Sequence, residues 1–511
     1  MNRASVHPWL RRAIEAKIDL GLVALGVALG ALSIVYPFGH DQGVHYYVGR
    51  EWFLHGAIPY RDTFDYKTPG IFAIHGLLVR VLGEQMWGIR VVEIGCVLAL
   101  GWATSALIRF ELPKNIEVST GFVLFATFVV YYGYFSFWDT AQCEIWALMF
   151  AFVALVAGRR GRHFLAGIFV GLTFLMKPPA VLLVAPLAWD VARPRARGLA
   201  GVAAGAALPI GLTLAYFALH HALGPMRDVL FGADTQYLVG SRAVDTPGEL
   251  FEALVNVITW FNPFSDLLLG VALVVLVRAR WARARSDLPW RVVALAVLAL
   301  VAVAVQLKFY RYHSVLLVGP IVMGLEHARA RLMPAWPGAG ALAVAVLFGI
   351  SGNPSRVWLA NEAPSLEYVL GVLPRASFAS RFSIPTLAYD EHDSEAVARW
   401  LREHTSPRDV VSVRGFEPEI YALAERRGPG RFFWTTAITD PKRKYKRAEW
   451  LAEDRSAIDA AKPPVIVTLA DAPPGPDAVG RFTALGYARC FSSGKLVVLS
   501  RNATNGPQAR N

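Results

Sequence analysis

Cysteine is scarce in this chain of 511 residues. The three cysteines, Cys96, Cys143 and Cys490, are too few for a disulfide framework, and no CxxC or His/Cys cluster indicates a structural metal site. Two of them fall in or beside apolar segments, so all three are interpreted as small buried hydrophobic residues. The sequence also has no Gly-rich phosphate loop, no internal repeat of fixed period and no low-complexity segment beyond Pro-rich bends.

Charge is scarce as well. Only 18% of the residues are charged, whereas 55% are hydrophobic, and the mean hydropathy is +0.39. Most of such a chain must be solvated by lipid, which indicates a polytopic α-helical membrane protein. The 51 Lys and Arg residues exceed the 39 Asp and Glu residues, but the excess is confined to short clusters between apolar segments. The net charge of +12 therefore does not indicate nucleic-acid binding.

The basic clusters predict which ends of the apolar segments face the cytoplasm, because short cytoplasmic loops are enriched in Lys and Arg. They lie at 11–12, 159–162, 193–197, 278–285 and 327–331. The apolar segment 20–38 is too long for a signal-peptide core and lacks a small-x-small cleavage pattern. We interpret it as an uncleaved anchor with the N-terminus inside.

Taking about 20 apolar residues per crossing predicts about eleven spans. They are expected near 20–38, 88–110, 118–137, 143–158, 164–176, 179–191, 199–220, 256–278, 291–306, 313–327 and 338–354. An odd number of crossings places the C-terminus on the extracytoplasmic side.

Two segments depart from simple spans. Residues 70–83 are too few to cross a bilayer and contain His75 and Arg80, so a helix lying in the outer interface is expected. The run 164–191 is interrupted at Lys177-Pro178-Pro179, which predicts two short helices meeting at an outer-face break.

The composition changes near residue 356. Residues 1–355 are predicted to form the transmembrane domain, with a first outer loop at 39–87, and residues 356–511 a soluble extracytoplasmic α/β domain. In this second domain, helical periodicity appears at 394–405 and 448–461, and buried strands are expected at 409–415, 464–470 and 495–501. Alternating helices and strands favour a small sheet with helices packed on it.

The first outer loop is the most informative segment. From His40 to Gly70 it carries four carboxylates, Asp41, Glu51, Asp62 and Asp65, together with Lys67, and a helix is expected within residues 44–56. A simple turn between two spans needs only a few polar residues, whereas this loop has about thirty and begins with an acid at the bilayer edge. The pattern indicates an active site at the membrane surface.

The order of these features resembles that of the GT-C membrane glycosyltransferases. An acid follows the first span, the motif G-x-x-P-Y-R-D-x-x-D-Y-K-x-P-G ends the loop, an interfacial helix follows, and a second outer acid comes after the third span. The resemblance covers about residues 15–355 and is strongest over 41–70. It is greatest to the bacterial aminoarabinose and galacturonic acid transferases that act on lipid A, with protein O-mannosyltransferases more distant. Many members have Asp-Glu at the first position, where this chain has Asp41-Gln42.

The resemblance implies transfer of a sugar from a polyprenyl-phosphate donor to a lipid, glycan or protein acceptor. It implies an enzyme of the bacterial inner membrane, without a nucleotide sugar and usually with inversion at the anomeric carbon. A carboxylate at the membrane edge suits the general base, and we assign that role to Asp41. The leaving phosphate needs cations, and Lys67 matches the family lysine that contacts it. Further cations on predicted outer ends are Lys177, Lys308, Arg311 and His313.

Other polar residues have secondary roles in this interpretation. Asp139 and Glu144 lie in the second outer loop, where an acid in similar proteins helps to bind the acceptor or a divalent ion; a metal is therefore an open alternative. Asp62 and Asp65 are expected to orient Lys67 or Arg61 by ion pairing.

Each assignment has a plainer alternative. Asp41 would be a solvated helix-end carboxylate, Lys67 a snorkelling interfacial lysine, and the 308–313 cluster an aromatic-basic anchor. Asp139 and Glu144 would be solvated loop acids. In the C-terminal domain, Arg414, Glu417 and Glu419 are interpreted as surface residues.

Two other functional classes compete with the enzyme. A transporter or flippase of lipid-linked sugars would place ionisable residues in mid-span and show related halves, whereas here they concentrate in outer loops. A non-catalytic scaffold whose outer domain binds a partner leaves the first loop unexplained. The sequence does not specify the sugar or the acceptor.

Overall fold

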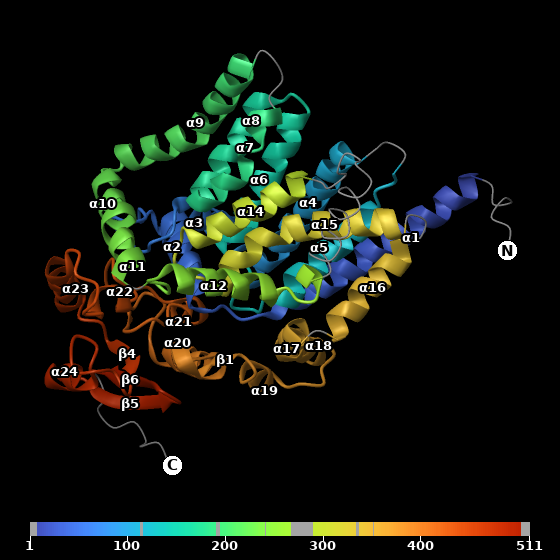
Figure 1. Cartoon of the computed structure of the whole chain (residues 1–511). Coiled ribbons are helices and arrows are strands. Elements are labelled where there is room, and N and C mark those ends of the chain that lie inside the picture. The colour runs from blue at the N-terminus through green and yellow to red at the C-terminus, as the bar shows by residue number, and fades with distance from the viewer. Residues whose placement is uncertain are drawn as a thin grey trace. The chain divides into compact units, whose positions relative to one another are not determined.

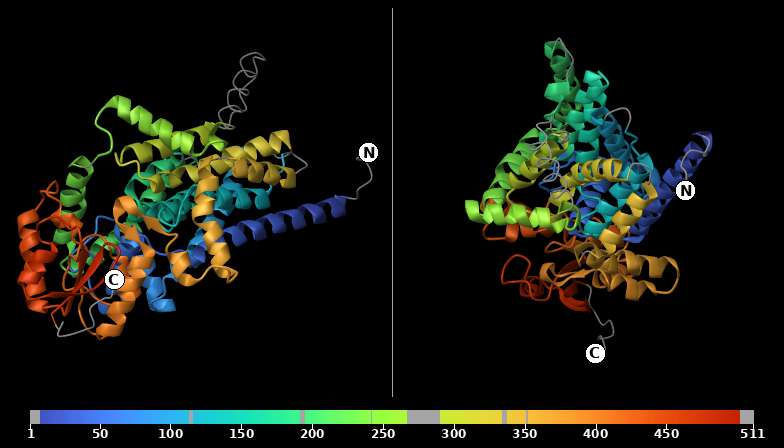
Figure 2. Two further views of the ribbon diagram at one scale, coloured as in Figure 1. Left: turned by 90° about the horizontal axis from the view of Figure 1, so that it is seen from below. Right: turned by 45° about the vertical axis from the view of Figure 1, so that its right-hand side comes forward.

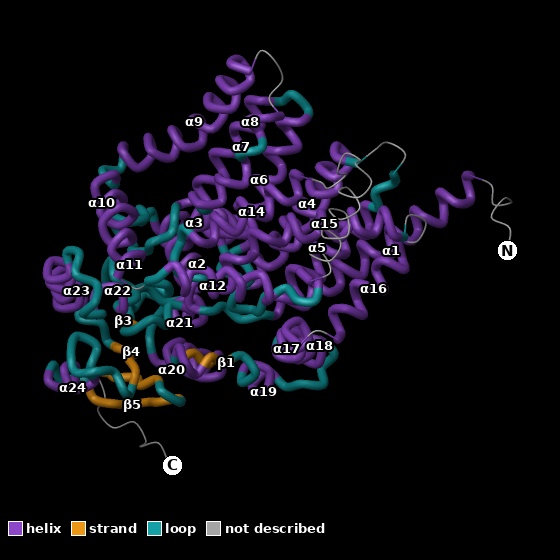
Figure 3. The backbone as a smooth tube through the Cα atoms, viewed as in Figure 1, coloured by secondary structure: helices purple, strands orange, loops and turns teal. Residues whose placement is uncertain are grey.

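A computed structural model describes residues 8–112, 116–190, 195–240, 242–266, 290–333, 337–350 and 352–501. The chain is mostly helical, and its named strands, orange in Figure 3, all lie between residues 383 and 500. The basic cluster at 278–285 and much of the expected span 256–278 lie outside the described residues. Contacts divide the chain into two compact units.

Unit 1 comprises Met1–Ile34, Arg90–Leu212 and Ala243–Ala363 and is helical (Figure 1). Its elements are α1 (Pro8–Ala31), η2 (Leu32–Val35), α4 (Trp87–Glu111), α5 (Thr120–Tyr134), α6 (Cys143–Arg159), α7 (His163–Met176), η3 (Pro178–Val184), α8 (Leu187–Asp190), α9 (Arg195–Leu219), α12 (Pro247–Trp260), α14 (Trp290–Ala304), η5 (Arg311–Leu317), α15 (Val318–Leu332), α16 (Pro337–Ile350), α17 (Gly352–Ala360) and α18 (Glu362–Val369). Of these, η2, α4, α9 and α18 cross the boundary between the units, and most of α18 belongs to unit 2.

Unit 2 comprises Val35–Ile89, Thr213–Arg242 and Pro364–Asn511. Its helices are α2 (His40–His55), α3 (Pro69–Leu82), α10 (Leu223–Arg227), the π-helix η4 (Asp228–Ala233), α11 (Asp234–Gly240), α19 (Arg375–Ala379), η6 (Pro385–Leu387), α20 (Glu391–His404), α21 (Glu419–Ala424), α22 (Thr436–Thr439), α23 (Arg447–Ala461) and α24 (Val479–Ala484). Its strands are β1 (Ser383–Ile384), β2 (Tyr389–Asp390), β3 (Ser412–Val413), β4 (Val465–Leu469), β5 (Ala488–Ser493) and β6 (Leu496–Ser500).

Within the described ranges, three helices are long and apolar enough to cross a bilayer: Ala13–Val35, Trp87–Glu111 and Ala196–Leu219. The bent pair Pro337–Leu347 and Gly352–Val369 would add a fourth if it forms one span. Other predicted crossings appear as apolar helices of 10–17 residues, among them Thr120–Tyr134 and His163–Met176. The predicted count of eleven is therefore not confirmed, because a 15-residue helix is only about 22 Å long and a bilayer core about 30 Å thick.

Close helix packing holds unit 1 together. In α1, blue in Figure 2, Gly26 and Gly30 face α5, and a Cβ on Gly30 would stand 2.7 Å from the ring of Phe128. The predicted break after α7 is confirmed, because the helix ends at Met176 and η3 starts at Pro178. Proline cannot donate the backbone hydrogen bond that would continue the helix.

The first outer loop belongs to unit 2, where it packs against residues of the C-terminal region. The expected helix at 70–83 is confirmed as α3, and the one at 44–56 begins earlier, at His40. On α2, Tyr47 stacks on Phe433 with ring centroids 4.1 Å apart, and its hydroxyl accepts a 2.8 Å hydrogen bond from the Gly428 N–H. Glu51 pairs with Arg427 at 2.7 Å. These contacts fix the helix that carries Asp41.

Unit 2 also contains a mixed four-stranded sheet, in the order β3-β4-β6-β5, and a two-stranded sheet of β1 and β2. β3 and β4 are parallel, while β6 pairs antiparallel with β4 and with β5. The helices predicted at 394–405 and 448–461 are confirmed as α20 and α23, and the strands predicted at 464–470 and 495–501 as β4 and β6. Strand β5 was not predicted, because half-exposed residues on an edge strand lack a continuous apolar run. The domain division at 355/356 differs from these contact-based units and stays a prediction.

Replacing Gly43 with alanine tests the packing of α2 on the C-terminal region. A Cβ at Gly43 would stand 2.6 Å from the backbone N of Glu419 and 2.9 Å from its Cα. Overpacking of this kind costs about 1–3 kcal/mol, so Gly43→Ala should melt at a lower temperature in detergent. The control is Gly21→Ala in α1, where nothing lies within 4 Å and alanine favours the helix. Equal melting temperatures for the two variants would contradict this packing.

Candidate active site

Asp41 lies in the first turn of α2, just after the N-cap residue Gly39. A carboxylate is favoured at this position, because the first N–H groups of a helix carry partial positive charge. The side chain is 21% exposed, although most of its helix neighbours are buried. Asp41 is therefore held by a buried helix but is accessible to a substrate.

Lys67 faces Asp41. Its Nζ atom lies 3.8 Å from the Asp41 Oδ2 atom, and both side chains are 21% exposed. The two residues are far apart in the loop, and a compact turn brings them together. In that turn Tyr60 adopts a positive φ of 68° and donates a 2.7 Å hydrogen bond from its hydroxyl to the Lys67 carbonyl. The structure thus places a carboxylate and a cation side by side.

Asp65 lies beside this pair but is buried, with 7% of the residue exposed. Burial raises the pKa of Asp65 to about 7, Lys67 opposes the rise, and Asp41 adds to it. Its Oδ2 atom accepts a 3.3 Å hydrogen bond from the Lys67 N–H. A group of this pKa changes its charge near neutral pH at the edge of the candidate site.

Arg61 and Asp62 pair with each other through two hydrogen bonds of 2.9 and 2.7 Å. Asp62 also accepts a 2.7 Å hydrogen bond from the Ile58 N–H, and Arg61 donates one of 2.7 Å to the His220 carbonyl. The pair therefore braces the turn that carries Lys67 and ties it to the end of α9.

The remaining predicted residues lie in unit 1, where each predicted carboxylate lies close to a cation. Lys177 at the break after α7 contacts Glu144 at the start of α6 at 2.7 Å, and His313 lies 4.0 Å from the same carboxylate. Arg311 lies 4.0 Å from Asp139 and its guanidinium stands 4.0 Å above the Trp260 ring. Lys308, on the same segment as Arg311, is buried. Metal ligation by Asp139 and Glu144 stays a prediction, and these cations would compete with a metal ion.

Two residues that the sequence interpretation missed, Arg90 and Glu93, hold the loop that carries Asp139. Both are fully buried near the start of α4. Arg90 donates to the Thr140 hydroxyl at 2.7 Å and to the Phe137 carbonyl at 3.1 Å, while Glu93 accepts from the Tyr131 hydroxyl at 2.5 Å and from the Ala141 N–H. The signal for them was present, because ionisable residues inside an apolar segment are costly and usually functional.

Arg414, Glu417 and Glu419 were predicted at the surface, and this is wrong: their exposures are 1%, 3% and 0%. Arg414 binds Asp454 through two hydrogen bonds of 2.9 and 2.8 Å and Asp477 through one of 2.8 Å. Partners so distant in sequence cannot be recognised from local pattern.

Glu419 accepts a hydrogen bond from Ser394 at 2.9 Å and lies 4.0 Å from His40, the residue preceding Asp41. Burial raises the pKa of Glu419 well above its ordinary value and that of Glu417 to about 8. Burial lowers the pKa of His40 to about 3, so this histidine is neutral beside the candidate site.

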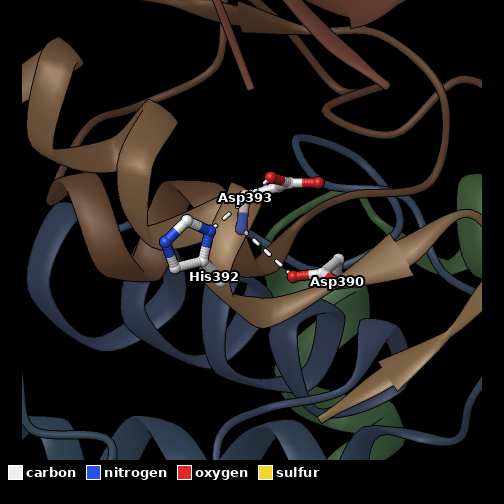
Figure 4. Close-up of side chains that lie close together, drawn as sticks. All are labelled: Asp390, His392 and Asp393. Atoms are coloured by element: carbon white, nitrogen blue, oxygen red, sulfur yellow. Dashed lines mark hydrogen bonds and ion pairs between the residues drawn. The ribbon is translucent and has the colours of Figure 1, made fainter. Parts of the chain in front are cut away.

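One group of side chains in the described part of the chain has the spacing of a metal site. Figure 4 shows Asp390, His392 and Asp393 at the start of α20, with a ligating atom of each within 4.8 Å of the others. Asp390 caps the helix by accepting from the Asp393 N–H at 3.3 Å, and Asp393 accepts from the Ser493 hydroxyl at 2.7 Å. These hydrogen bonds account for the group as a helix start, without a metal ion.

Comparisons with known proteins identify similar sequences and structures. Residues 66–220 match the family model described as dolichyl-phosphate-mannose-protein mannosyltransferase. The structure of ArnT from Cupriavidus metallidurans bound to undecaprenyl phosphate matches with a TM-score of 0.60 at 14% identity, covering 96% of this chain and 99% of that one. The chain has the GT-C fold.

Two further solved structures match the chain. ArnT from the same organism in the apo state gives a TM-score of 0.59 at 15% identity, with 96% of this chain and 99% of that chain covered. The Archaeoglobus fulgidus oligosaccharyltransferase complex with Zn and sulfate gives 0.45 at 14% identity, with 88% and 68% covered. No curated protein matches this chain by sequence. The GT-C glycosyltransferase resemblance inferred from the loop motif is confirmed.

The raised pKa of Glu417 predicts how stability depends on pH. Its folded pKa of about 8 exceeds the ordinary value of 4.5, so the folded state binds the proton more tightly than the unfolded state. This contribution is complete below pH 4.5 and is lost as the pH rises to 8. Between pH 5 and pH 8, the melting temperature of Glu417→Gln should therefore fall less than that of the wild type. Thermal unfolding in detergent measures both.

The control is Glu403→Gln on the exposed face of α20, which should follow the wild type across the same pH range. If the melting temperatures of Glu417→Gln and the wild type changed equally with pH, Glu417 would be ionised in the folded protein.

Proposed function

We propose that the protein is an integral membrane glycosyltransferase that transfers a sugar from a polyprenyl-phosphate donor to an extracytoplasmic hydroxyl acceptor. The observation that carries the proposal is the 3.8 Å pair of Asp41 and Lys67, both partly exposed, at the start of a buried helix. A base and a phosphate-binding cation are the two groups that this reaction needs. The GT-C fold, shared with an ArnT structure bound to undecaprenyl phosphate, supports this choice of donor.

The proposed reaction is a single displacement. Asp41 accepts the proton of the acceptor hydroxyl as its oxygen attacks the anomeric carbon from the side opposite the phosphate. The bond from that carbon to the phosphate oxygen breaks, and its electron pair leaves with the polyprenyl phosphate. Lys67 stabilises the released negative charge, so no proton donor is needed for the leaving group. Attack from the opposite side inverts the anomeric configuration.

The membrane edge is a suitable place for this reaction. In unit 2, Arg61 binds the carbonyl of His220, the residue after α9 ends, and the Trp52 indole donates a 2.6 Å hydrogen bond to the Tyr216 hydroxyl on α9 itself. Because α9 contains a candidate span, Ala196–Leu219, the loop carrying Lys67 adjoins the end of a membrane helix. A lipid phosphate at the bilayer surface would reach such a loop.

We propose that the cations of unit 1 help to bind the donor phosphate. Arg311 is the strongest candidate among them for a phosphate, since its side chain is 46% exposed and its planar guanidinium can bind two oxygens. Lys177, Lys308 and His313 would support it, and Asp139 and Glu144 would help to bind the acceptor. The N-terminus is proposed to be cytoplasmic, and residues 356–511 extracytoplasmic, in a bacterial inner membrane.

A transporter or flippase remains the alternative class, but the buried ionisable residues give it little support. Arg90 and Glu93, near the start of the candidate span Trp87–Glu111, are bound to the loop around Asp139 by hydrogen bonds. They therefore have a local structural role that requires no translocation path.

Asp41→Asn tests the base. The amide has the same size but cannot accept the proton, so release of polyprenyl phosphate should fall at least about 10²-fold. Purified protein and a panel of polyprenyl-phosphate sugars provide the assay, and the melting temperature should stay near that of the wild type. Asp471→Asn, an exposed acid of unit 2 outside the site, is the matched control. Full activity of Asp41→Asn would end the assignment of the base.

Lys67→Ala tests the phosphate contact. Loss of the cation should raise the KM for the donor more than the KM for the acceptor, because only the donor carries phosphate. Lys67→Arg keeps the charge and should recover part of the donor affinity. Initial rates with each substrate varied in turn give both constants, and a larger change for the acceptor would reject the assignment.

A further inference from the structure

A basic loop in the C-terminal region has no role in the proposed reaction. Five cations occur between Asp440 and Arg447, namely Lys442, Arg443, Lys444, Lys446 and Arg447. Three carboxylates balance part of this charge: Asp440 and Glu449 lie near Arg443 and Lys446 at 3.4 and 3.6 Å, and Asp228 lies 2.9 Å from Lys446. The described residues contain no ion pair for Lys442 or Lys444, which are both exposed.

The loop is fixed to the helical stretch Leu223–Gly240, formed by α10, η4 and α11. Lys446 and the Tyr445 hydroxyl bind Asp228, the Tyr445 N–H donates to the Gln236 side chain, and the Arg443 guanidinium stands 4.6 Å above the Tyr237 ring. The packing is close, since a Cβ on Gly232 would stand 2.3 Å from the Tyr445 ring. The loop and this helical stretch therefore form one surface of unit 2.

Chain connectivity places this surface at the membrane edge. The candidate span Ala196–Leu219 ends four residues before α10 begins at Leu223, so the two ends are at most about 14 Å apart. Asp228, which binds the basic loop, is the first residue of η4 and comes five residues later, about 8 Å along the helix. The attachment point of the loop is thus close to the bilayer surface.

Exposed apolar side chains on the same helical stretch agree with this placement. Phe231 is 73% exposed, Val239 57% and Leu223 40%. Large apolar groups open to water are unfavourable, whereas in the interface of a bilayer they are buried among headgroups and acyl chains. Apolar residues together with adjacent cations are the combination found in elements that lie on anionic membranes.

We propose that the basic loop 442–447, with the exposed apolar side chains of Leu223–Gly240, is a docking surface for the anionic headgroups of membrane phospholipids. Lys442 and Lys444 bind the headgroup phosphates, and Phe231 and Val239 enter the interface beside them. The loop also contacts the candidate site, because Arg443 donates a 2.9 Å hydrogen bond to the hydroxyl of Tyr66, the residue before Lys67. Headgroup binding would hold unit 2 at the bilayer surface, where a lipid substrate is presented.

The test uses the full-length protein purified in neutral detergent and titrated with phosphatidylglycerol, with bound lipid counted by native mass spectrometry. The wild type should bind phosphatidylglycerol more tightly than phosphatidylcholine. Lys442→Glu/Lys444→Glu should weaken the tightest phosphatidylglycerol binding at least about tenfold, because each basic residue near an anionic surface adds to the attraction. The control, Arg489→Glu/Lys495→Glu, makes the same charge change on the β5–β6 hairpin and should leave binding unchanged.

Competition separates a lipid surface from a free-anion site and from the donor site. Inorganic phosphate at the same phosphate concentration should not displace the lipid; displacement would show a free-anion site and overturn the proposal. The proposal would also be overturned if the loop variant and the hairpin control lost phosphatidylglycerol affinity equally. Equal affinity of the wild type for the two lipids would overturn it too. Lys67→Ala, which removes the proposed donor contact, should leave phosphatidylglycerol binding intact, which separates the surface from the donor site. If the melting temperature shows that the charge reversal impairs folding, Lys442→Gln/Lys444→Gln replaces it, with a smaller loss expected.

Discussion

The pairing of Asp41 with Lys67 is the interaction on which the functional interpretation depends. A base and a phosphate-binding cation are useful together only if their positions are fixed before substrate arrives, because a mobile pair would lose much of its effect to reorganisation. Here the fixed positions come from the contacts of α2 and of the turn before Lys67. Helix α2 is held through Tyr47 and Glu51, and the turn before Lys67 is closed by the Tyr60 hydroxyl.

Buried charge is used differently in the two units. In unit 1, Glu144 and Asp139 are each matched with a cation, and Arg90 and Glu93 are bound to the loop between α5 and α6. In unit 2, several carboxyl groups are buried with only partial compensation, and their pKa values rise accordingly. Protonation relieves the cost of burying these groups, so the charge of unit 2 responds to pH.

Local pattern was sufficient wherever the decisive partners are near in sequence. Helix α3, the break at Lys177-Pro178-Pro179 and the two long helices of the C-terminal region follow from apolar periodicity and proline chemistry, which act over a few residues. Local pattern was insufficient for the edge strand β5, and hydropathy alone did not establish eleven crossings, because several apolar segments fold into helices shorter than a bilayer.

The sequence by itself determined the apolar, helix-rich character of the chain and the GT-C resemblance, and it singled out Asp41 and Lys67 as candidate site residues, because composition and a contiguous motif carry that information. Only the tertiary structure decided that Arg414, Glu417 and Glu419 are interior, that Arg90 and Glu93 position a loop, and that residues 442–447 lie against Leu223–Gly240. The physical reason is common to all three: burial and pairing depend on residues tens to hundreds of positions away, which local pattern does not specify.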